Sequence, residues 1–278
     1  MYDFSRFDGP SDEWLAVEKS LPRPLENQSL EEVKQTTNAG REAVAAKEFA
    51  ELAGQLSTKD LSIPTRDGHN LEARTYRRTE GRLPLYIHFH GGGWFFGTLN
   101  SEDAACGRLA VGVEIVVLNV NYRHTPEHPY PVAWCDADDA VAWAIENASK
   151  LNIDASQIIV GGISAGGNLA ASTSLRHDLK GQLLLIPNLV HLDCYEPQFA
   201  KMRPGVSSVI TNKDAPILPM DRMRWFTDML RAKPDPQDFR LSPGNASVKS
   251  PPTFIVVAGL DPLRDEGILF GQQLADNG

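Results

Sequence analysis

The chain has 278 residues, of which 42% are hydrophobic, and its 36 acidic and 27 basic side chains give a formal net charge of −9. This length and composition suffice for a large buried core, and α/β proteins of this size often form one domain. The acidic balance and the absence of long basic runs argue against nucleic acid or an anionic membrane as a partner.

The N-terminus, Met1–Asp8, lacks the basic and apolar regions of a signal peptide, and no run of about 18 apolar residues is present in the sequence. These features predict a cytoplasmic protein without a membrane span. The cysteines Cys106, Cys135 and Cys194 are odd in number and widely spaced, which is typical of reduced structural thiols.

The first 54 residues are polar and are predicted to be helical from about Ser11 to Gly54. Strands are then expected around seven apolar centres: Leu61, Leu71, Leu85, Ile115, Ile158, Leu183 and Ile255. Helical stretches lie between most of them, and the clearest, Val132–Lys150, repeats its alanines on one face. This alternation predicts a mostly parallel sheet with helices on both faces.

Residues 55–190 and 251–278 are expected to form this core, with residues 1–54 as an N-terminal cap segment and 191–250 as a cap insertion. The insertion is rich in Pro, Met and aromatic residues. Five large apolar side chains fall on a helix predicted for Met220–Arg231: Met220, Met223, Trp225, Phe226 and Met229. They either pack in a core or join Trp14 and Leu15 as a cap that lines a site for an acyl chain.

Two glycine-rich motifs point to acyl-transfer chemistry. A GxSxG pattern, Gly162–Gly166, stands between the predicted strand 157–160 and a helix that can run to about His177. A serine at such a sharp turn projects its hydroxyl from the sheet, although the pattern alone is weak. The second motif, His90–Trp94, follows the predicted strand 85–90, and its three glycines allow backbone N–H groups to approach an anionic oxygen.

A third element lies near the end of the sequence. Asp261 follows the predicted strand 252–259, at the strand end where open α/β sheets gather functional groups. It can also cap the next helix, and the two roles are compatible. His88 and His90 share one face of a strand, but no third ligand is suitably spaced, so no metal site is expected.

In this order the motifs resemble the hormone-sensitive-lipase-like branch of the α/β-hydrolase carboxylesterases. The resemblance covers about residues 55–278 and includes the segment from Asn121 to Pro131 and the DPLRDE run at Asp261. It implies an α/β-hydrolase fold with a helical cap, and an esterase that needs no cofactor and acts on a small-molecule ester. It also implies Ser164 as nucleophile, Asp261 as triad acid, and Gly92, Gly93 and Ala165 as oxyanion-hole donors.

The resemblance further implies that His90 and Gly91 belong to the oxyanion loop, and we expect Trp94, Trp225 and Phe226 to line the substrate pocket. One departure is Ile163, which stands where the family usually has Asp. The triad of this fold ends in a histidine after the acid. Only 17 residues follow Asp261, and they are predicted to form one helix, about 264–275, so the family's last strand and histidine are expected to be missing.

None of the seven histidines is expected to replace the missing base. Two functions therefore stay open at this point. The chain is a carboxylesterase impaired as it stands, or a fold that kept its pocket and lost catalysis, like the gibberellin receptors of plants, which resemble this family.

Without the family's last strand, the uncharged strand predicted over 253–258 would lie at the edge of the sheet. An unpaired strand of this kind favours a homodimer.

Overall fold

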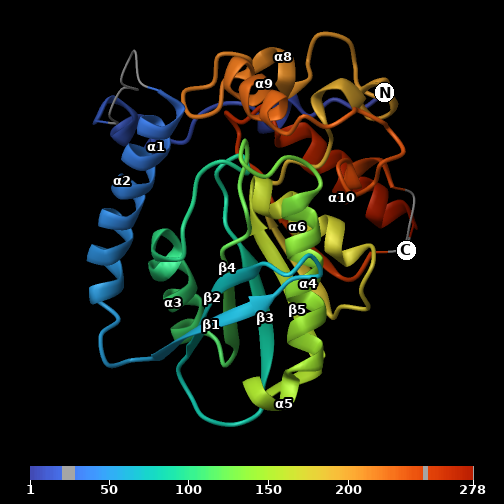
Figure 1. The fold of residues 1–278 in the computed structure, drawn as a ribbon. Coiled ribbons are helices and arrows are strands. Elements are labelled where there is room, and N and C mark those ends of the chain that lie inside the picture. Colours follow the sequence, from blue (N-terminus) through green and yellow to red (C-terminus); the bar gives the residue numbers. More distant parts are fainter. Residues whose placement is uncertain (21–28, 247–249, 278) are drawn as a thin grey trace.

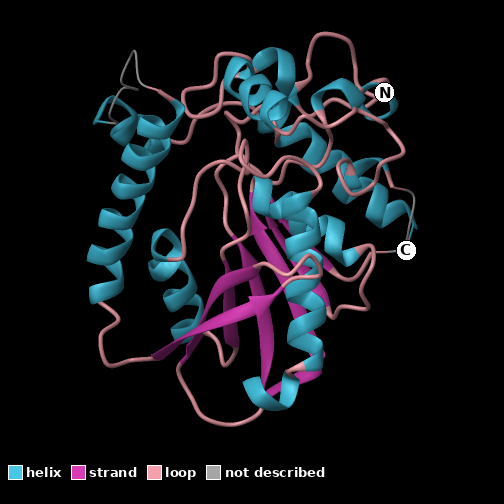
Figure 2. Ribbon diagram, viewed as in Figure 1, coloured by secondary structure: helices cyan, strands magenta, loops and turns pink. Residues whose placement is uncertain are grey.

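In a computed structural model, residues 1–20, 29–246 and 250–277 are described. A seven-stranded sheet crosses the molecule (Figure 2). Its strand order is β1-β2-β4-β3-β5-β6-β7. Its strands are β1 (Ser57–Pro64), β2 (Asn70–Arg77), β3 (Leu83–Phe89), β4 (Val116–Val120), β5 (Ile153–Ile163), β6 (Gly181–Leu185) and β7 (Thr253–Val256). Each lies at or next to one of the seven apolar centres predicted from the sequence.

The β1–β2 and β2–β4 pairs are antiparallel, and the other four strand pairs are parallel. All five residues of β4 are buried, as expected for a strand covered on both faces. The predicted fold class, a mostly parallel sheet between helices, is confirmed.

Helices cover the two faces of the sheet (Figure 1). On one face α3 (Asp103–Gly112) contributes Cys106 and Ala110 to a cluster with Tyr76 and Val117 of the sheet. The larger core lies on the opposite face and contains apolar residues of three helices: α4 (Val132–Glu146), α6 (Ala165–Ser174) and α10 (Arg264–Asn277). The sheet therefore supplies a rigid platform between two separate apolar layers.

Several element ends differ from the sequence prediction. The helix expected over 132–150 breaks at Asn147 into α4 and α5 (Ala148–Leu151), which ends where Asn152 adopts a left-handed conformation. Helix α6 stops before His177 because the chain turns there, with the amides of residues 176 and 177 both bonded to Thr173. Helix α10 runs to Asn277, and β7 ends at Val256, opposite the last residue of β6.

The remaining helices gather mostly at one end of the sheet (Figure 1). They are α1 (Asp12–Val17), α2 (Leu30–Ala50), α7 (Glu196–Phe199), α8 (Ser208–Thr211) and α9 (Met220–Met229). Short 3-10 turns are η1 (Ser5–Phe7), η2 (Glu18–Ser20), η3 (Asn100–Glu102), η4 (Leu192–Cys194) and η5 (Pro243–Asn245). Residues 21–28 of the predicted N-terminal helical region lie outside the described residues. The division into core and cap remains a prediction.

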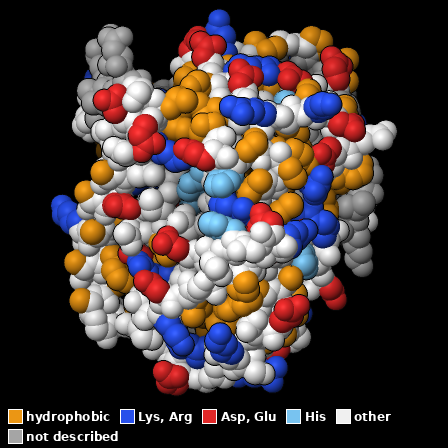
Figure 3. Space-filling view, in the orientation of Figure 1, with side chains coloured by type: hydrophobic (Ala, Val, Ile, Leu, Met, Phe, Trp, Pro, Cys, Tyr) orange, Lys and Arg blue, Asp and Glu red, His pale blue; other side chains and the backbone are white. Residues whose placement is uncertain are grey.

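Helix α2 begins with a capping box, in which Ser29 and Glu32 bond reciprocally through side chain and backbone. On the face of the molecule shown in Figure 3, acidic and basic side chains are interspersed with apolar ones, so neither charge dominates that face. Within the described ranges, no helix combines the length and hydropathy needed to cross a membrane.

Candidate active site

Ser164 occupies a strained turn between β5 and α6, with φ 54° and ψ −113°. Positive φ is costly for an L-residue with a side chain and persists only where the surroundings enforce it. Two glycines enforce it here, because a Cβ atom on either Gly162 or Gly166 would collide with the carbonyl oxygen of Phe89. The turn is thus pressed against the end of β3, and Ser164 lies beside the loop that follows that strand.

That loop contains the three consecutive glycines. Gly92 has φ +133° and Gly93 has φ +63°, a region open to glycine but strained for other residues. A Cβ atom would collide with the Phe96 carbonyl at Gly92 and with the Phe226 ring at Gly93. Among the described residues, neither the Gly92 nor the Gly93 amide has a hydrogen-bond acceptor. Unpaired amides are rare in folded proteins, and two adjacent ones bordering a cavity can receive an anionic oxygen.

Ala165 is the first residue of α6 and is buried. An amide at this position has no acceptor within its own helix, and the N-terminal end of a helix attracts negative charge. The amide of Ala165 follows Ser164 directly, so it can act on the same oxygen as the two glycine amides.

Asp261 lies after β7, where its Oδ1 accepts a hydrogen bond from the Leu263 amide at 2.8 Å. The Asn212 side chain donates to the backbone carbonyls of Gly259 and Asp261 and holds this turn. Burial raises the pKa of Asp261 to about 6, although the Leu263 amide opposes the shift. No cation or imidazole bonds to its carboxylate among the described residues, so the group is desolvated without an ionic partner.

A cavity of about 890 Å³ brings these groups together. Of the residues predicted for the site, it is lined by Gly91, Gly92, Gly93, Ser164, Phe226 and Asp261. Ile163, at the position where the family usually has Asp, also lines it. The wall is mostly apolar, with Ser164, Asp261 and Arg41 among its few polar residues. This combination is typical of a small-molecule site.

Four predicted residues lie outside the lining. Ala165 and His90 stand behind the wall, where the His90 ring stacks on Tyr122 with centroids 4.3 Å apart. Trp94 is buried against Trp134, with ring centroids 5.3 Å apart.

Trp225 packs edge-on against Phe95, with centroids 5.0 Å apart, although its neighbour Phe226 reaches the cavity. Consecutive residues of a helix point in different directions, which explains why only one of the two lines the cavity. Met223 of the same helix packs with Leu192 and Leu263. Helix α9 therefore contributes both to core packing and to the cavity wall.

No histidine lines the cavity in the part of the chain that the structure describes. His88 bonds to Glu102, His124 to His90, and His177 to Asp138. His191 accepts a hydrogen bond from the Asp193 amide through Nδ1. The Ser164 hydroxyl has no hydrogen-bond partner among the described residues, so no acceptor for its proton is in place there.

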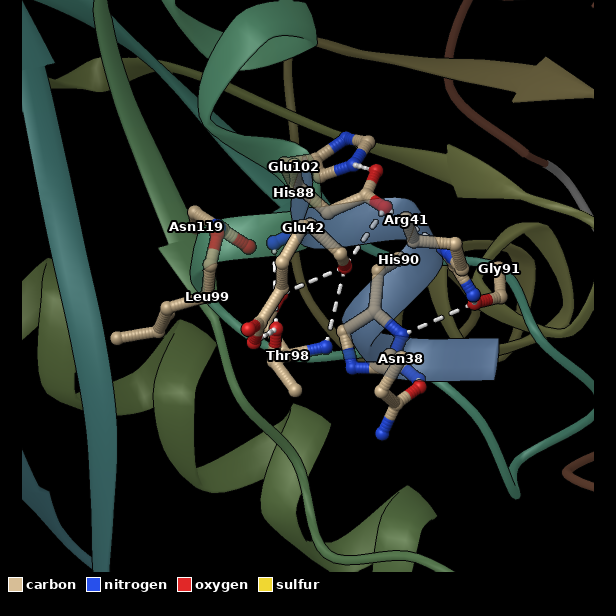
Figure 4. Close-up of polar contacts among 12 residues, drawn as sticks. Asn38, Arg41, Glu42, His88, His90, Gly91, Thr98, Leu99, Glu102 and Asn119 are labelled. Carbon is tan, nitrogen blue, oxygen red and sulfur yellow. Dashed lines mark hydrogen bonds and ion pairs between the residues drawn. The ribbon is translucent and has the colours of Figure 1, made fainter. Parts of the chain in front are cut away.

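Sequence patterns missed much of the cavity wall. The N-terminal segment contributes Phe7, Gly9, Pro10, Ser11 and Trp14, and α2 contributes Thr37 and Arg41. Of the two N-terminal residues named as a possible cap, Trp14 lines the cavity, whereas Leu15 is 49% exposed and does not. Arg41 belongs to a network of polar contacts around the glycine loop (Figure 4), and no local motif marks it.

The chain is similar in sequence and in structure to known esterases. A family model described as alpha/beta hydrolase fold matches residues 86–278. Esterase LipI of Mycobacterium tuberculosis is 36% identical over 206 residues, which are 72% of this chain but only 62% of LipI. Ethyl acetate hydrolase of Pseudomonas putida is 33% identical over 84% of this chain and 77% of its own length. The hyperthermophilic esterase of Pyrobaculum calidifontis superposes with a TM-score of 0.81 at 32% identity, over 96% of this chain and 86% of that one.

Proposed function

The chain belongs to the α/β-hydrolase family, in its hormone-sensitive-lipase-like carboxylesterase branch, and on this premise we propose that Ser164 is the nucleophile of a carboxylic ester hydrolase. One observation carries the proposal. Ser164 is held at positive φ in the same cavity as two glycines whose amides have no acceptor among the described residues. A strained nucleophile and unpaired donors are both expected where a tetrahedral oxyanion has to be stabilised.

In this mechanism the Ser164 oxygen attacks the ester carbonyl carbon, and negative charge develops on the carbonyl oxygen. The amides of Gly92, Gly93 and Ala165 receive that charge. The alcohol leaves with a proton, an acyl-serine ester remains, and water hydrolyses it to the acid and free serine. Loss of one such donor typically costs about 3–4 kcal/mol of transition-state stabilisation.

The substrate that we propose is an ester of a small apolar acid. Phe96, Ile186, Leu218 and Phe226 lie on the wall of the cavity, and its volume of about 890 Å³ is enough for a small ligand. Two arginines line the cavity: Arg222 is exposed and donates to the Ile217 carbonyl, and Arg41 is neutralised by its ion pair with Glu102. An apolar acyl group therefore fits this cavity better than a charged one.

The proton of Ser164 needs an acceptor. We propose that a histidine from outside these 278 residues supplies it and that Asp261 orients this histidine, so the 278-residue chain alone turns over slowly. The lack of a histidine on the described cavity wall also favours a second candidate function, an inactive small-molecule binding protein built on the same pocket.

Labelling with a fluorophosphonate probe, followed by peptide mapping, distinguishes the two functions. We expect slow but specific modification of Ser164, and no modification of that peptide in Ser164→Ala. The matched control is Ser174→Ala, which alters a buried serine at the other end of α6. Equal labelling of the Ser164→Ala protein, or no labelling of the unchanged chain, would reject the esterase proposal in favour of the binder.

A further inference from the structure

Helix α2 holds the glycine loop through three side chains (Figure 4). The Arg41 Nη1 atom donates to the Gly91 carbonyl at 3.1 Å. Asn38, about one turn before Arg41, accepts from the Gly97 amide at 2.9 Å. Glu42, directly after Arg41, accepts from the Thr98 hydroxyl at 2.6 Å. Helix α2 thus forms hydrogen bonds with both ends of the loop that carries the proposed oxyanion donors.

The contact to the Gly91 carbonyl matters most, because of the geometry of a peptide bond. In a trans peptide, the carbonyl of one residue and the N–H of the next lie in one plane and point in opposite directions. A group that fixes the Gly91 oxygen therefore also fixes the direction of the Gly92 N–H. Glycines at 91, 92 and 93 leave this peptide free to rotate unless something outside the loop holds it.

The Gly91 carbonyl has a second donor, the Nδ1 atom of His90 at 3.1 Å. If Nδ1 carries the proton, Nε2 of His90 is an acceptor, and the His124 Nε2 at 3.2 Å must be the donor to it. Burial lowers the pKa of His90 to about 4, with the charge of Arg41 adding to the effect and that of Glu102 opposing it. Burial also lowers the pKa of His124 well below its ordinary value. The two imidazoles are therefore neutral near pH 7, and Arg41 is a positively charged donor to the same carbonyl.

Arg41 is itself fixed. Its Nη2 atom pairs with Glu102 at 2.7 Å, and His88 bonds to the other carboxylate oxygen of Glu102 at 3.1 Å. The Glu102 side chain is only 5% exposed. Burial alone would raise the pKa of Glu102, but His88, His90 and Arg41 outweigh it and lower the pKa to about 2. An ionised carboxylate and a planar guanidinium fork make a directional pair, which a lysine would not reproduce.

We propose that Arg41 is a positioning residue of the oxyanion hole: it binds the Gly91 carbonyl and thereby turns the Gly92 N–H toward the carbonyl oxygen of the substrate. This role rests on the proposed esterase function. Docking of α2 then becomes a condition for stabilising the transition state as well as a means of covering the cavity.

The contact can be separated from the general anchoring of α2. Arg108 of α3 also pairs with α2, through Glu48 at 3.1 Å, but it does not touch the glycine loop. The variant Arg108→Ala therefore removes an ion pair of the same helix and leaves the Gly91 carbonyl bound. It serves as the matched control for Arg41→Ala.

The test measures the rate of fluorophosphonate labelling at Ser164, together with the melting temperature. We expect Arg41→Ala to slow the maximal labelling rate by about 10- to 100-fold, somewhat less than the loss of a direct oxyanion donor, with little change in probe affinity. Arg41→Lys should fall between Arg41→Ala and the unchanged chain, and Arg108→Ala should label normally. Guanidinium ion far below denaturing concentrations should restore part of the Arg41→Ala rate, whereas equal sodium chloride should not.

Labelling of Arg41→Ala at the unchanged rate, or a loss that guanidinium does not relieve, would overturn the positioning role while leaving Ser164 as nucleophile. If Arg41→Ala fails to fold, Arg41→Lys carries the same test, because it keeps the charge and loses the fork. Labelling that persists in Ser164→Ala would instead overturn the esterase proposal, and the role of Arg41 with it.

Discussion

The loop after β3 and the loop after β7 border one cavity but are held in different ways. The first bears Gly92 and Gly93. Its backbone accepts hydrogen bonds from Arg41 of helix α2, from Tyr122 and from the ring of its own His90. The second bears Asp261, whose carboxylate accepts one hydrogen bond, from the Leu263 amide. The loop with the proposed oxyanion donors is thus held by several side chains, whereas the carboxylate proposed to assist proton transfer has no ionic partner among the described residues.

The largest effect should come from supplying the histidine that the site around Asp261 and Ser164 lacks among the described residues. A family-like strand and histidine added after residue 278 should raise hydrolysis of p-nitrophenyl butyrate by a factor on the order of 10⁴ to 10⁶, the usual cost of losing a triad base. The physical reason is that Ser164 is a weak nucleophile until its proton has an acceptor.

The control is the same extension carrying alanine in place of the histidine, measured beside Ser164→Ala in both lengths. Turnover by the 278-residue chain at the rates normal for esterases would contradict the comparison, since it would mean that a base is already present near Ser164.

The glycine loop after β3 can be disrupted by adding one methyl group. In Gly93→Ala, the new Cβ would collide with the Phe226 ring at a φ of +63°. The loop must shift, and the amide of residue 93 moves with it. We expect labelling of Ser164 to slow by about 10²-fold, near the cost of losing one oxyanion donor.

Gly68→Ala is the matched control, because Gly68 has a similar φ of +83° and an added Cβ would meet nothing within 4 Å. Both variants bear the backbone cost of alanine at positive φ, roughly 1–2 kcal/mol in stability. Only Gly93→Ala should lose labelling. Equal labelling of the two proteins would show that the Gly93 amide takes no part in the reaction.

A third prediction concerns stability and pH at Glu266, just behind the acid loop. Its Oε1 accepts from the Leu189 amide at 2.5 Å, and the residue is buried. Burial raises the pKa of Glu266 from its ordinary value of 4.5 to about 8, with the Leu189 amide opposing the shift. Between these two pH values the folded protein keeps a proton that the unfolded chain has released, so the free energy of unfolding falls as pH rises.

A glutamine at position 266 does not titrate, so the free energy of unfolding of Glu266→Gln should not fall for this reason as pH rises. We expect its free energy of unfolding, relative to the unchanged chain, to rise by a few kcal/mol from pH 4.5 to 8 and then level off, on the order of 1.4 kcal/mol per pH unit at most. Urea unfolding across that range measures it, with the exposed Glu80→Gln as control. Parallel curves for Glu266→Gln and the unchanged chain would mean that Glu266 is ionised in the folded state.

The two loops also show what sequence could and could not provide. The glycine motifs, Ser164 and Asp261 follow apolar strands, so local pattern alone places them at one sheet edge, and the structure brings them to one cavity. Arg41 lies on a polar helix without an apolar stripe, and its partner Gly91 is 50 residues away. Contacts of this kind depend on how α2 docks, which periodicity does not determine. The orientations of Trp94 and Trp225 likewise depend on packing partners far along the chain, Trp134 and Phe95 respectively.

The smallest expected effect concerns β7, the outermost strand on the side of the acid loop. Its Phe254 is 65% exposed and Val256 is 40% exposed, on the sheet face away from α10. An uncharged apolar edge strand is a template for pairing with another chain, and we propose that two copies associate weakly through this strand.

Val256→Lys should weaken the dimer by about tenfold, because the charge would have to be desolvated on pairing. Val44→Lys, at a 60% exposed valine of α2, should not. Light scattering across a concentration series decides: a monomer at all concentrations, or equal dimers for both variants, would mean that β7 is not an interface.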